Sequence, residues 1–408
     1  MITPRQFAQR AAPALFAVMP GLLEAQVATR TLSKPEVEFG EPFSSVTAVR
    51  ELRDGRVLVT DSKDKIVQLV DLKGQRASKV GREGSGPGEY GLPMALVGLP
   101  GDTSIVFDPL NSRYLTILPD GKSGATFRLE DGAPPPKAAP GDGPATGRSI
   151  ATISSPRGVD GRGLLYFEGS PISFGPNGPV ASDSAPVMRY DRKTWRYDTL
   201  TFVQLPKNGA QIQNSGSGGQ RNVQIRIGGN SPFPARDGWT VLPNGSVMVV
   251  RVRDYHIDVV SPSKQVTKGP AVAYTPVKVG EAEKQEYRDA QKNPTSIGIT
   301  RSVDNGKVTT GAAPIPPAAE PKEWPAQKPA FIAQNGVLAT PNGEIWVLRS
   351  RAAKDDVPRY DVFSSTGRLI GSVVLPKKTR VVGFGSRGAI YTVRSDEDDL
   401  LYLQRFRG

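Results

Sequence analysis

Six charged side chains occupy the same place in six similar segments of the sequence. Each ends a short alternating apolar segment that follows a glycine-containing turn, as in LRDGRVLVTD at 52–61. The first three are acidic and the last three are arginines: Asp61, Asp108, Glu168, Arg251, Arg349 and Arg394. Carboxylates supply the oxygen ligands that calcium prefers, and arginine grips carboxylate or phosphate groups through paired hydrogen bonds. These six residues are therefore the candidate ligand-binding positions.

The composition excludes several kinds of catalytic site. The chain has no cysteine, which excludes disulfides, cysteine-held zinc and thiol nucleophiles. Its one histidine, His256, excludes zinc held by several imidazoles, and a Ser-His-Asp triad would have to use this residue. His256 lies in YHIDVV, which reads as an outer strand remote from the centre of the fold. We expect a packed or surface histidine there and assign no catalytic residue.

The six charges are carried by hairpins with a glycine in the turn. Asp-Gly and Asn-Gly turns between alternating segments are strong hairpin signals, because both central positions of a type I′ turn need positive φ. The glycines that mark the six turns are Gly55, Gly101, Gly161, Gly245, Gly343 and Gly388. The first pair is 46 residues apart and the last pair 45, the length of a four-stranded propeller blade. The longer intervals are the same unit with insertions.

A second hairpin follows the first in five of the six repeats, and the sixth stops after one more strand at 400–408. A propeller that lacks its last outer strand is closed by an N-terminal strand, and residues 28–40 are predicted to supply it. The predicted fold is all-β, a six-bladed β-propeller closed by an N-terminal strand, with long loop insertions on one face. The predicted blades lie near 45–80, 93–129, 148–204, 236–275, 331–376 and 379–408, the last completed by 28–40.

The hairpins and the glycine-rich linker GREGSGPGEY at 81–90 resemble the NHL-repeat and TolB-like six-bladed propellers of bacterial secreted proteins. The resemblance implies the fold, which hosts binding modules, lactonases and lyases alike, so function has to be argued from a site. The linker does not open a helix and is therefore not a phosphate-binding fingerprint. We expect its Arg82, Glu83, Glu89 and Tyr90 to pair locally.

The N-terminus indicates the localisation of the protein, and the net charge indicates the kind of partner that it binds. Residues 1–25 read as a signal peptide, with Arg5 and Arg10 before an apolar run at 11–23 and Ala25 for cleavage. That run is too short to span a bilayer, and no other stretch could, so we expect a secreted or periplasmic monomer without a transmembrane segment. A net charge of +12 favours a protein or anionic glycan partner. Without a dense basic block or an RNA-binding motif, nucleic acid is disfavoured.

The long insertions all fall on one face of the predicted ring. They connect strand d to the next strand a, or strand b to strand c, at 130–147, 169–186, 204–237, 276–329 and 350–358. Long loops on a rigid scaffold are where binding sites are usually built. The largest contains a predicted helix at 281–292 and is expected to cap part of the funnel mouth.

The six charges should then ring the mouth, negative on one side and positive on the other, which suits a dipolar ligand. Alternatively, the acids accept hydrogen bonds from the b–c turn or pair with a nearby base such as Lys63. We therefore predict a non-enzymatic binding propeller without a cofactor. The alternative is a lactonase or hydrolase assisted by calcium on Asp61, Asp108 and Glu168, which the opposing arginines disfavour.

Overall fold

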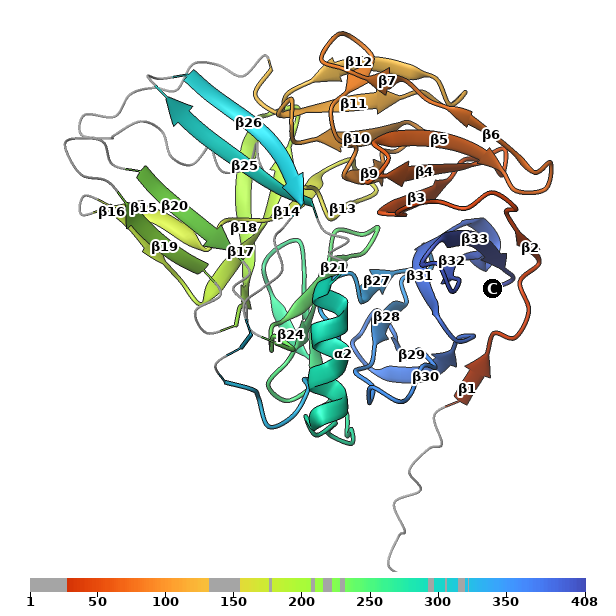
Figure 1. Ribbon diagram of the computed structural model, residues 1–408, viewed down its shortest axis with the longest axis vertical. Coiled ribbons are helices and arrows are strands. Elements are labelled where there is room, and N and C mark those ends of the chain that lie inside the picture. The colour runs from red at the N-terminus through yellow and green to blue at the C-terminus, as the bar shows by residue number, and fades with distance from the viewer. Residues whose placement is uncertain are drawn as a thin grey trace, which may run out of the picture.

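The computed structural model describes most of the chain. The described residues are 28–131, 155–175, 178–206, 210–215, 222–227, 232–292, 297–304, 307–314, 320, 321 and 323–408. The predicted signal peptide and most of the insertion at 130–147 lie outside them. The fold is a six-bladed β-propeller, seen along the ring axis in Figure 1.

Each blade is built on four antiparallel strands that run from an inner strand a to an outer strand d, and blade five carries a fifth. Blade one comprises β3 (Ala48–Glu51), β4 (Val57–Asp61), β5 (Ile66–Asp71) and β6 (Arg76–Lys79). Blade two comprises β9 (Ala95–Gly98), β10 (Ser104–Asp108), β11 (Arg113–Ile117) and β12 (Ser123–Phe127). Blade three comprises β13 (Gly158–Val159), β14 (Leu165–Glu168), β17 (Ser184–Asp191) and β18 (Arg196–Gln204).

The other three blades follow the same order. Blade four comprises β21 (Gly238–Val241), β22 (Val247–Arg251), β23 (His256–Val260) and β24 (Val266–Lys268). Blade five comprises β27 (Val337–Ala339), β28 (Ile345–Leu348), β29 (Arg359–Phe363) and β30 (Leu369–Val374). Blade six comprises β31 (Thr379–Phe384), β32 (Ile390–Ser395) and β33 (Leu401–Phe406), with its fourth strand taken from the N-terminus.

The turns between strands a and b differ from the predicted type I′ hairpins. In blade one the Leu52 amide donates to the Arg56 carbonyl, and the Gly55 amide donates to the Leu52 carbonyl. Blades three, four and five repeat this pattern. It belongs to a three-residue loop with one left-handed glycine, so Asp54 does not need positive φ. In blade three the left-handed residue is Gly163, with φ 84°, and the marker predicted at Gly161 is wrong by two positions.

The N-terminal segment closes the ring, and it spans two blades. β2 (Val37–Glu38) pairs antiparallel with β33 as the outer strand of blade six, as predicted. β1 (Ala28–Thr31) instead pairs parallel with β30 and becomes a fifth strand of blade five. Pro35 separates the two strands, and a proline lacks the amide that a continuous strand would donate.

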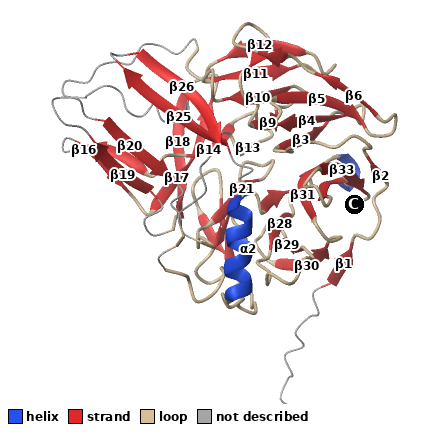
Figure 2. Ribbon diagram, in the orientation of Figure 1, coloured by secondary structure: helices blue, strands red, loops and turns tan. Residues whose placement is uncertain are grey.

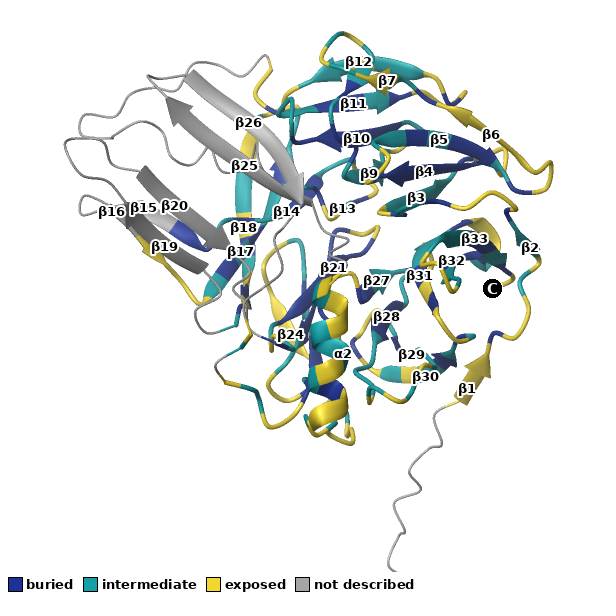
Figure 3. Ribbon diagram, in the orientation of Figure 1, coloured by how far each residue is buried: buried dark blue, intermediate teal, exposed yellow. Residues whose placement is uncertain are grey.

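The core lies between the faces of neighbouring blades, so the middle strands are the buried ones (Figure 3). One cluster joins blades one and six through Val57, Val59, Tyr391 and Leu403, and the N-terminal Phe39 packs into it. Burying each such side chain contributes ~1.5–3 kcal/mol. The apolar alternation of the strands therefore builds both the sheets and the contacts between them.

The inserted segments form small elements of their own. The glycine-rich linker contains the short parallel pair β7 (Arg82–Glu83) and β8 (Glu89–Tyr90). The longer insertions contain hairpins: β15 (Ile172–Gly175) with β16 (Gly178–Ala181), β19 (Ala210–Ser215) with β20 (Asn222–Ile227), and β25 (Ile297–Asp304) with β26 (Lys307–Pro314).

Helix α2 (Glu281–Lys292) occupies the segment where the charge pattern predicts a helix. Figures 1 and 2 show it in front of blades four and five, beside the centre of the ring and not across it. Glu283 accepts a hydrogen bond from the Ala353 amide, and Glu286 pairs with Lys328 at 2.7 Å. The first contact ties the helix to the b–c loop of blade five, and the second ties it to the segment that precedes strand a of that blade. Within the described part of the chain, no helix is long and apolar enough to cross a membrane.

Candidate functional site

Asp61 and Asp108 are buried and hold the chain around them. Asp61, 1% exposed, accepts hydrogen bonds from the backbone amides of Ser45, Lys63 and Asp64. Its carboxylate therefore joins the segment that enters strand a to the b–c turn. Burial raises the pKa of Asp61, and the three amide donors oppose that effect.

Asp108 has the same surroundings in blade two. It is fully buried and accepts from the amides of Gly91 and Leu92 and from the side-chain amide of Asn111. Both oxygens of each aspartate are thus engaged by donors of the protein itself. This matches the structural alternative that the sequence left open for these two residues.

Glu168 lies between two arginines and a tryptophan. Its Oε1 is 2.6 Å from Nη2 of Arg236, its Oε2 is 3.3 Å from Nη2 of Arg157, and Trp239 donates Nε1–H to Oε2 at 2.9 Å. Burial opposes ionisation of Glu168, but the two guanidinium groups outweigh it and lower the pKa of the carboxyl. Glu168 therefore stays ionised as the shared counter-ion of two cations.

Each of the three predicted arginines is paired with a carboxylate in its own blade. Arg251 pairs with Asp237 and Asp258, Arg349 pairs with Asp361, and Arg394 pairs with Glu38 of β2. Among the described residues, no hydrogen bond or ion pair joins any two of the six predicted positions. Their charges are thus neutralised locally, and a ligand role for these positions stays a prediction.

His256 is 5% exposed and sits between two carboxylates. Its Nε2 lies 3.1 Å from Oδ1 of Asp258, and its Nδ1 lies 2.7 Å from Oδ1 of Asp254. These contacts are those of a packed histidine with two acidic neighbours in strand c of blade four.

Three arginines stand at the starts of inner strands, in blades three, four and six, and the sequence reasoning missed them. Arg157 and Arg236 stand just before β13 and β21, and Arg380 is the second residue of β31. We call these the inner-strand arginines. Arg157 and Arg236 share Glu168, whereas Arg380 donates only to the Val46 carbonyl, at 2.7 Å, and has no carboxylate partner among the described residues. Arg157 and Arg236 therefore bring two positive charges to one carboxylate, and Arg380 adds a separate positive charge in blade six.

Arg380 is also accessible. The residue is exposed, yet the protein around it lowers the pKa of its guanidinium. The side chain of Arg380 therefore reaches solvent from a position that is largely surrounded by protein. The signal in the sequence is an arginine before or at the start of the inner strand, as in PRGVD (156–160) and TRVVG (379–383). The repeats were aligned on the turn between strands a and b, which lies at the other end of strand a. The arginines at the start of strand a were therefore not noticed.

The donor set does not fit a hard cation. Calcium takes six to eight oxygen ligands that point to one place. Asp61 and Asp108 are saturated by amides in separate blades, and Glu168 is held by two arginines. Within the described residues, no three acidic or histidine side chains are grouped to hold a metal ion.

Millimolar calcium is therefore expected to leave the melting temperature of the protein unchanged. A cation bound at a hundred times its Kd would stabilise the fold by ~2.7 kcal/mol, which a thermal melt detects. The matched control is magnesium at the same concentration, with protein first treated with a chelator. A rise in melting temperature that calcium produces and magnesium does not would contradict the expectation.

The chain was compared with known families and structures. No protein-family model and no curated protein matches it. Among solved structures, a putative exported protein from Bacteroides fragilis is 11% identical, with a TM-score of 0.45, covering 93% of this chain and 99% of its own. The calcium-binding protein regucalcin from Agrobacterium tumefaciens is 9% identical, with a TM-score of 0.42, covering 92% and 96%. A putative gluconolactonase is 11% identical, with a TM-score of 0.39, covering 90% and 91%. Similarity of this degree says nothing about the ligand or activity of this chain.

Proposed function

We propose that the protein is a non-enzymatic, secreted or periplasmic binding propeller that takes an anionic partner on the face carrying the long loops. The observation that carries the proposal is Arg380, an exposed residue at the inner edge of blade six whose guanidinium has no carboxylate partner among the described residues. The partner is a protein or glycan that presents carboxylate, sulfate or phosphate groups. Membership of the NHL-repeat or TolB-like class stays a prediction.

The chemistry of the inner-strand arginines supports this choice. Guanidinium groups present several N–H donors in a fixed plane and bind oxyanions with charge-assisted hydrogen bonds. Arg380 uses one donor on the Val46 carbonyl and has others to offer. The overall charge of +12 attracts anionic partners over longer range. A hydrolase would in addition need a free acid, base or metal ligand, and the acids near the b–c turns are already engaged.

Reversing the charge of Arg380 tests the proposal. The Arg380→Glu variant is expected to bind an acidic polysaccharide without uronate groups, such as dextran sulfate, at least ~10-fold more weakly, because a charge-assisted hydrogen bond contributes ~1.5–3 kcal/mol. The measurement is a binding titration at fixed salt.

The matched control is Arg368→Glu, an exposed arginine on the c–d turn of blade five whose side chain makes no ion pair among the described residues. It changes the net charge equally. If both variants weaken binding to the same degree, the polysaccharide responds only to overall charge, and the proposed site is wrong.

A further inference from the structure

Two arginines face each other across adjacent strands at the edge of blade two. Arg113 begins β11 and Arg128 directly follows β12. The ladder between these strands pairs Tyr114 with Phe127 and Leu115 with Thr126, so Arg113 and Arg128 are the next pair along. They share the strand face of Thr126, because side chains alternate across a strand. Like charges placed opposite each other destabilise a sheet unless something compensates them.

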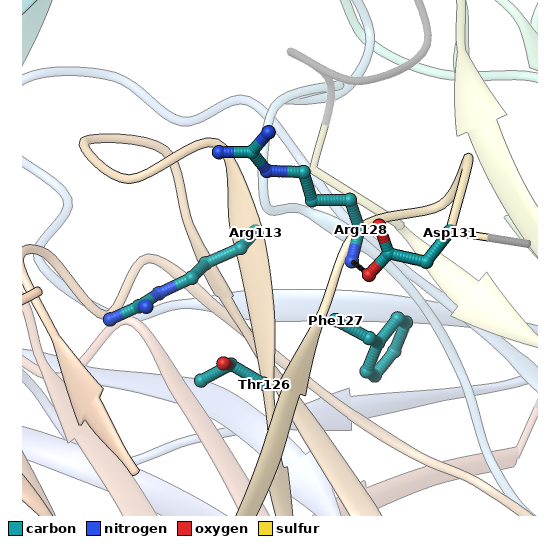
Figure 4. A pocket seen from close by; sticks show the side chains of 5 residues that line it. All are labelled: Arg113, Thr126, Phe127, Arg128 and Asp131. Carbon is teal, nitrogen blue, oxygen red and sulfur yellow. Dashed lines mark hydrogen bonds between the residues drawn. The ribbon is translucent and has the colours of Figure 1, made fainter. Parts of the chain in front are cut away.

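A hollow of about 210 Å³ lies at this pair, lined by Arg113, Thr126, Phe127, Arg128 and Asp131. Figure 4 shows the Arg113 and Arg128 side chains extending to the same side of the strand end, with Thr126 on that side as well. Phe127 stacks on Tyr114, with ring centroids 5.4 Å apart, and Arg192 lies over its ring at 4.0 Å. The strand end that forms one wall is therefore held by packed side chains.

Arg113 is fixed in place by the glycine-rich linker. Its guanidinium donates to the carbonyls of Ser85, Gly86 and Glu89 at 2.8 to 3.0 Å, and its side chain is 13% exposed. Asp108 lies 3.7 Å from its Nε. The linker itself is tied by the ion pair of Arg82 with Glu89. Arg113 thus contributes a cation whose position is set before any ligand arrives.

Arg128 is the exposed partner, and its guanidinium has no partner among the described residues. Its backbone amide donates to Oδ2 of Asp131 at 2.7 Å, which fixes the main chain at the strand end. Its side chain makes no hydrogen bond or ion pair with any residue that the structure describes, and the residue is exposed. Arg113 supplies the fixed charge of the hollow, and Arg128 supplies free donors.

We propose that this hollow binds a hydroxylated carboxylic acid of monosaccharide size, such as a hexuronate. The carboxylate would bind the Arg128 guanidinium on the side that faces Arg113, because Asp108 already pairs with Arg113 and Arg128 has no counter-ion among the described residues. The Thr126 hydroxyl and the Asp131 carboxylate, both in the lining, are partners for sugar hydroxyls. The volume exceeds that of a bare oxyanion, and Asp131 disfavours a ligand that offers only negative charge. The site is separate from the inner-strand arginines and does not depend on the function proposed for them.

The test is a calorimetric titration of the full chain with D-glucuronate. Binding in the range of ~1 mM is expected, with a loss of at least about tenfold in Arg128→Ala. The matched control is Arg53→Ala, an exposed arginine on the a–b turn of blade one, which should bind glucuronate as the unmodified protein does. Arg380→Glu should also leave glucuronate binding unchanged, which separates this site from the proposed function.

Glucose and acetate identify which part of the ligand is recognised. Glucose, which has the hydroxyls without the carboxylate, should bind at least about tenfold more weakly than glucuronate. Acetate should also bind more weakly, because it has no hydroxyls for Thr126 and Asp131. The proposal is overturned if glucuronate does not bind, if Arg128→Ala leaves its affinity unchanged, or if acetate binds as tightly.

Discussion

Removing residues 28–40 is expected to lower the melting temperature sharply, and the single change Phe39→Ala is expected to account for much of the loss. Phe39 is 1% exposed and packs with residues of blades one and six. Emptying such a site costs ~3–5 kcal/mol, which for a chain of this length lowers the melting temperature by ~4–6 °C. The truncation removes in addition the β2 ladder and the buried Leu32, so its effect should be larger.

The matched control for Phe39→Ala is Ile370→Ala in β30, a large apolar residue that is 48% exposed. It removes side-chain volume without opening a cavity and should change the melting temperature by less than ~2 °C. Thermal unfolding followed by circular dichroism compares the variants. A truncated chain that melts like the full one would refute closure of the ring by this segment.

Much of the fold can be predicted from the sequence, because the patterns that indicate its turns and strands are local. A left-handed glycine such as Gly55 or Gly245 recurs where strand a turns into strand b, and the apolar alternation after it marks the buried strand. The position of the left-handed glycine within the turn was harder to predict. The turn DGRG at 160–163 offers two glycines, and only the hydrogen bond from the Gly163 amide to the Asp160 carbonyl shows which one is left-handed. The place of β1 on blade five could not be predicted, because blade five already has four strands of its own and its sequence shows no missing strand for β1 to supply.

The candidate site was harder to predict, because whether a charged side chain is available to a ligand depends on which residues it pairs with in the folded protein. Arg349 directly follows β28 and Arg394 is the second-to-last residue of β32, close to where the sequence placed them, but Asp361 on β29 and Glu38 on β2 neutralise them. These ion pairs cannot be predicted from the spacing of residues along the chain, because they depend on strand register and on ring closure. Arg380 is the opposite case. It is a candidate binding residue because it has no carboxylate partner among the described residues, and the sequence alone does not show this.

Replacing Arg349 by methionine is expected to destabilise the protein by ~3–5 kcal/mol, because it leaves the buried Asp361 carboxylate without its cation. Asp361 is fully buried and contacts the Arg349 guanidinium at 2.5 Å. Its other partner is the hydroxyl of Tyr255, which donates to Oδ2 at 2.5 Å. Burial and the nearby carboxylate raise the pKa of Tyr255, so the phenol keeps its proton and compensates no charge. Unfolding in urea measures the loss.

Arg162→Met is the matched control, because Arg162 also pairs with a fully buried aspartate, Asp160. That carboxylate keeps the backbone amides of residue 162 and of Leu164 and the hydroxyl of Tyr166, so the loss should be only ~1 kcal/mol. Adding Asp361→Asn to Arg349→Met removes the stranded charge and should recover part of the stability. If the double variant is no more stable than Arg349→Met, the loss comes from packing of the arginine stem and not from the carboxylate. If Arg349→Met unfolds like the unmodified protein, the pair is not structural, and a ligand role for Arg349 gains weight.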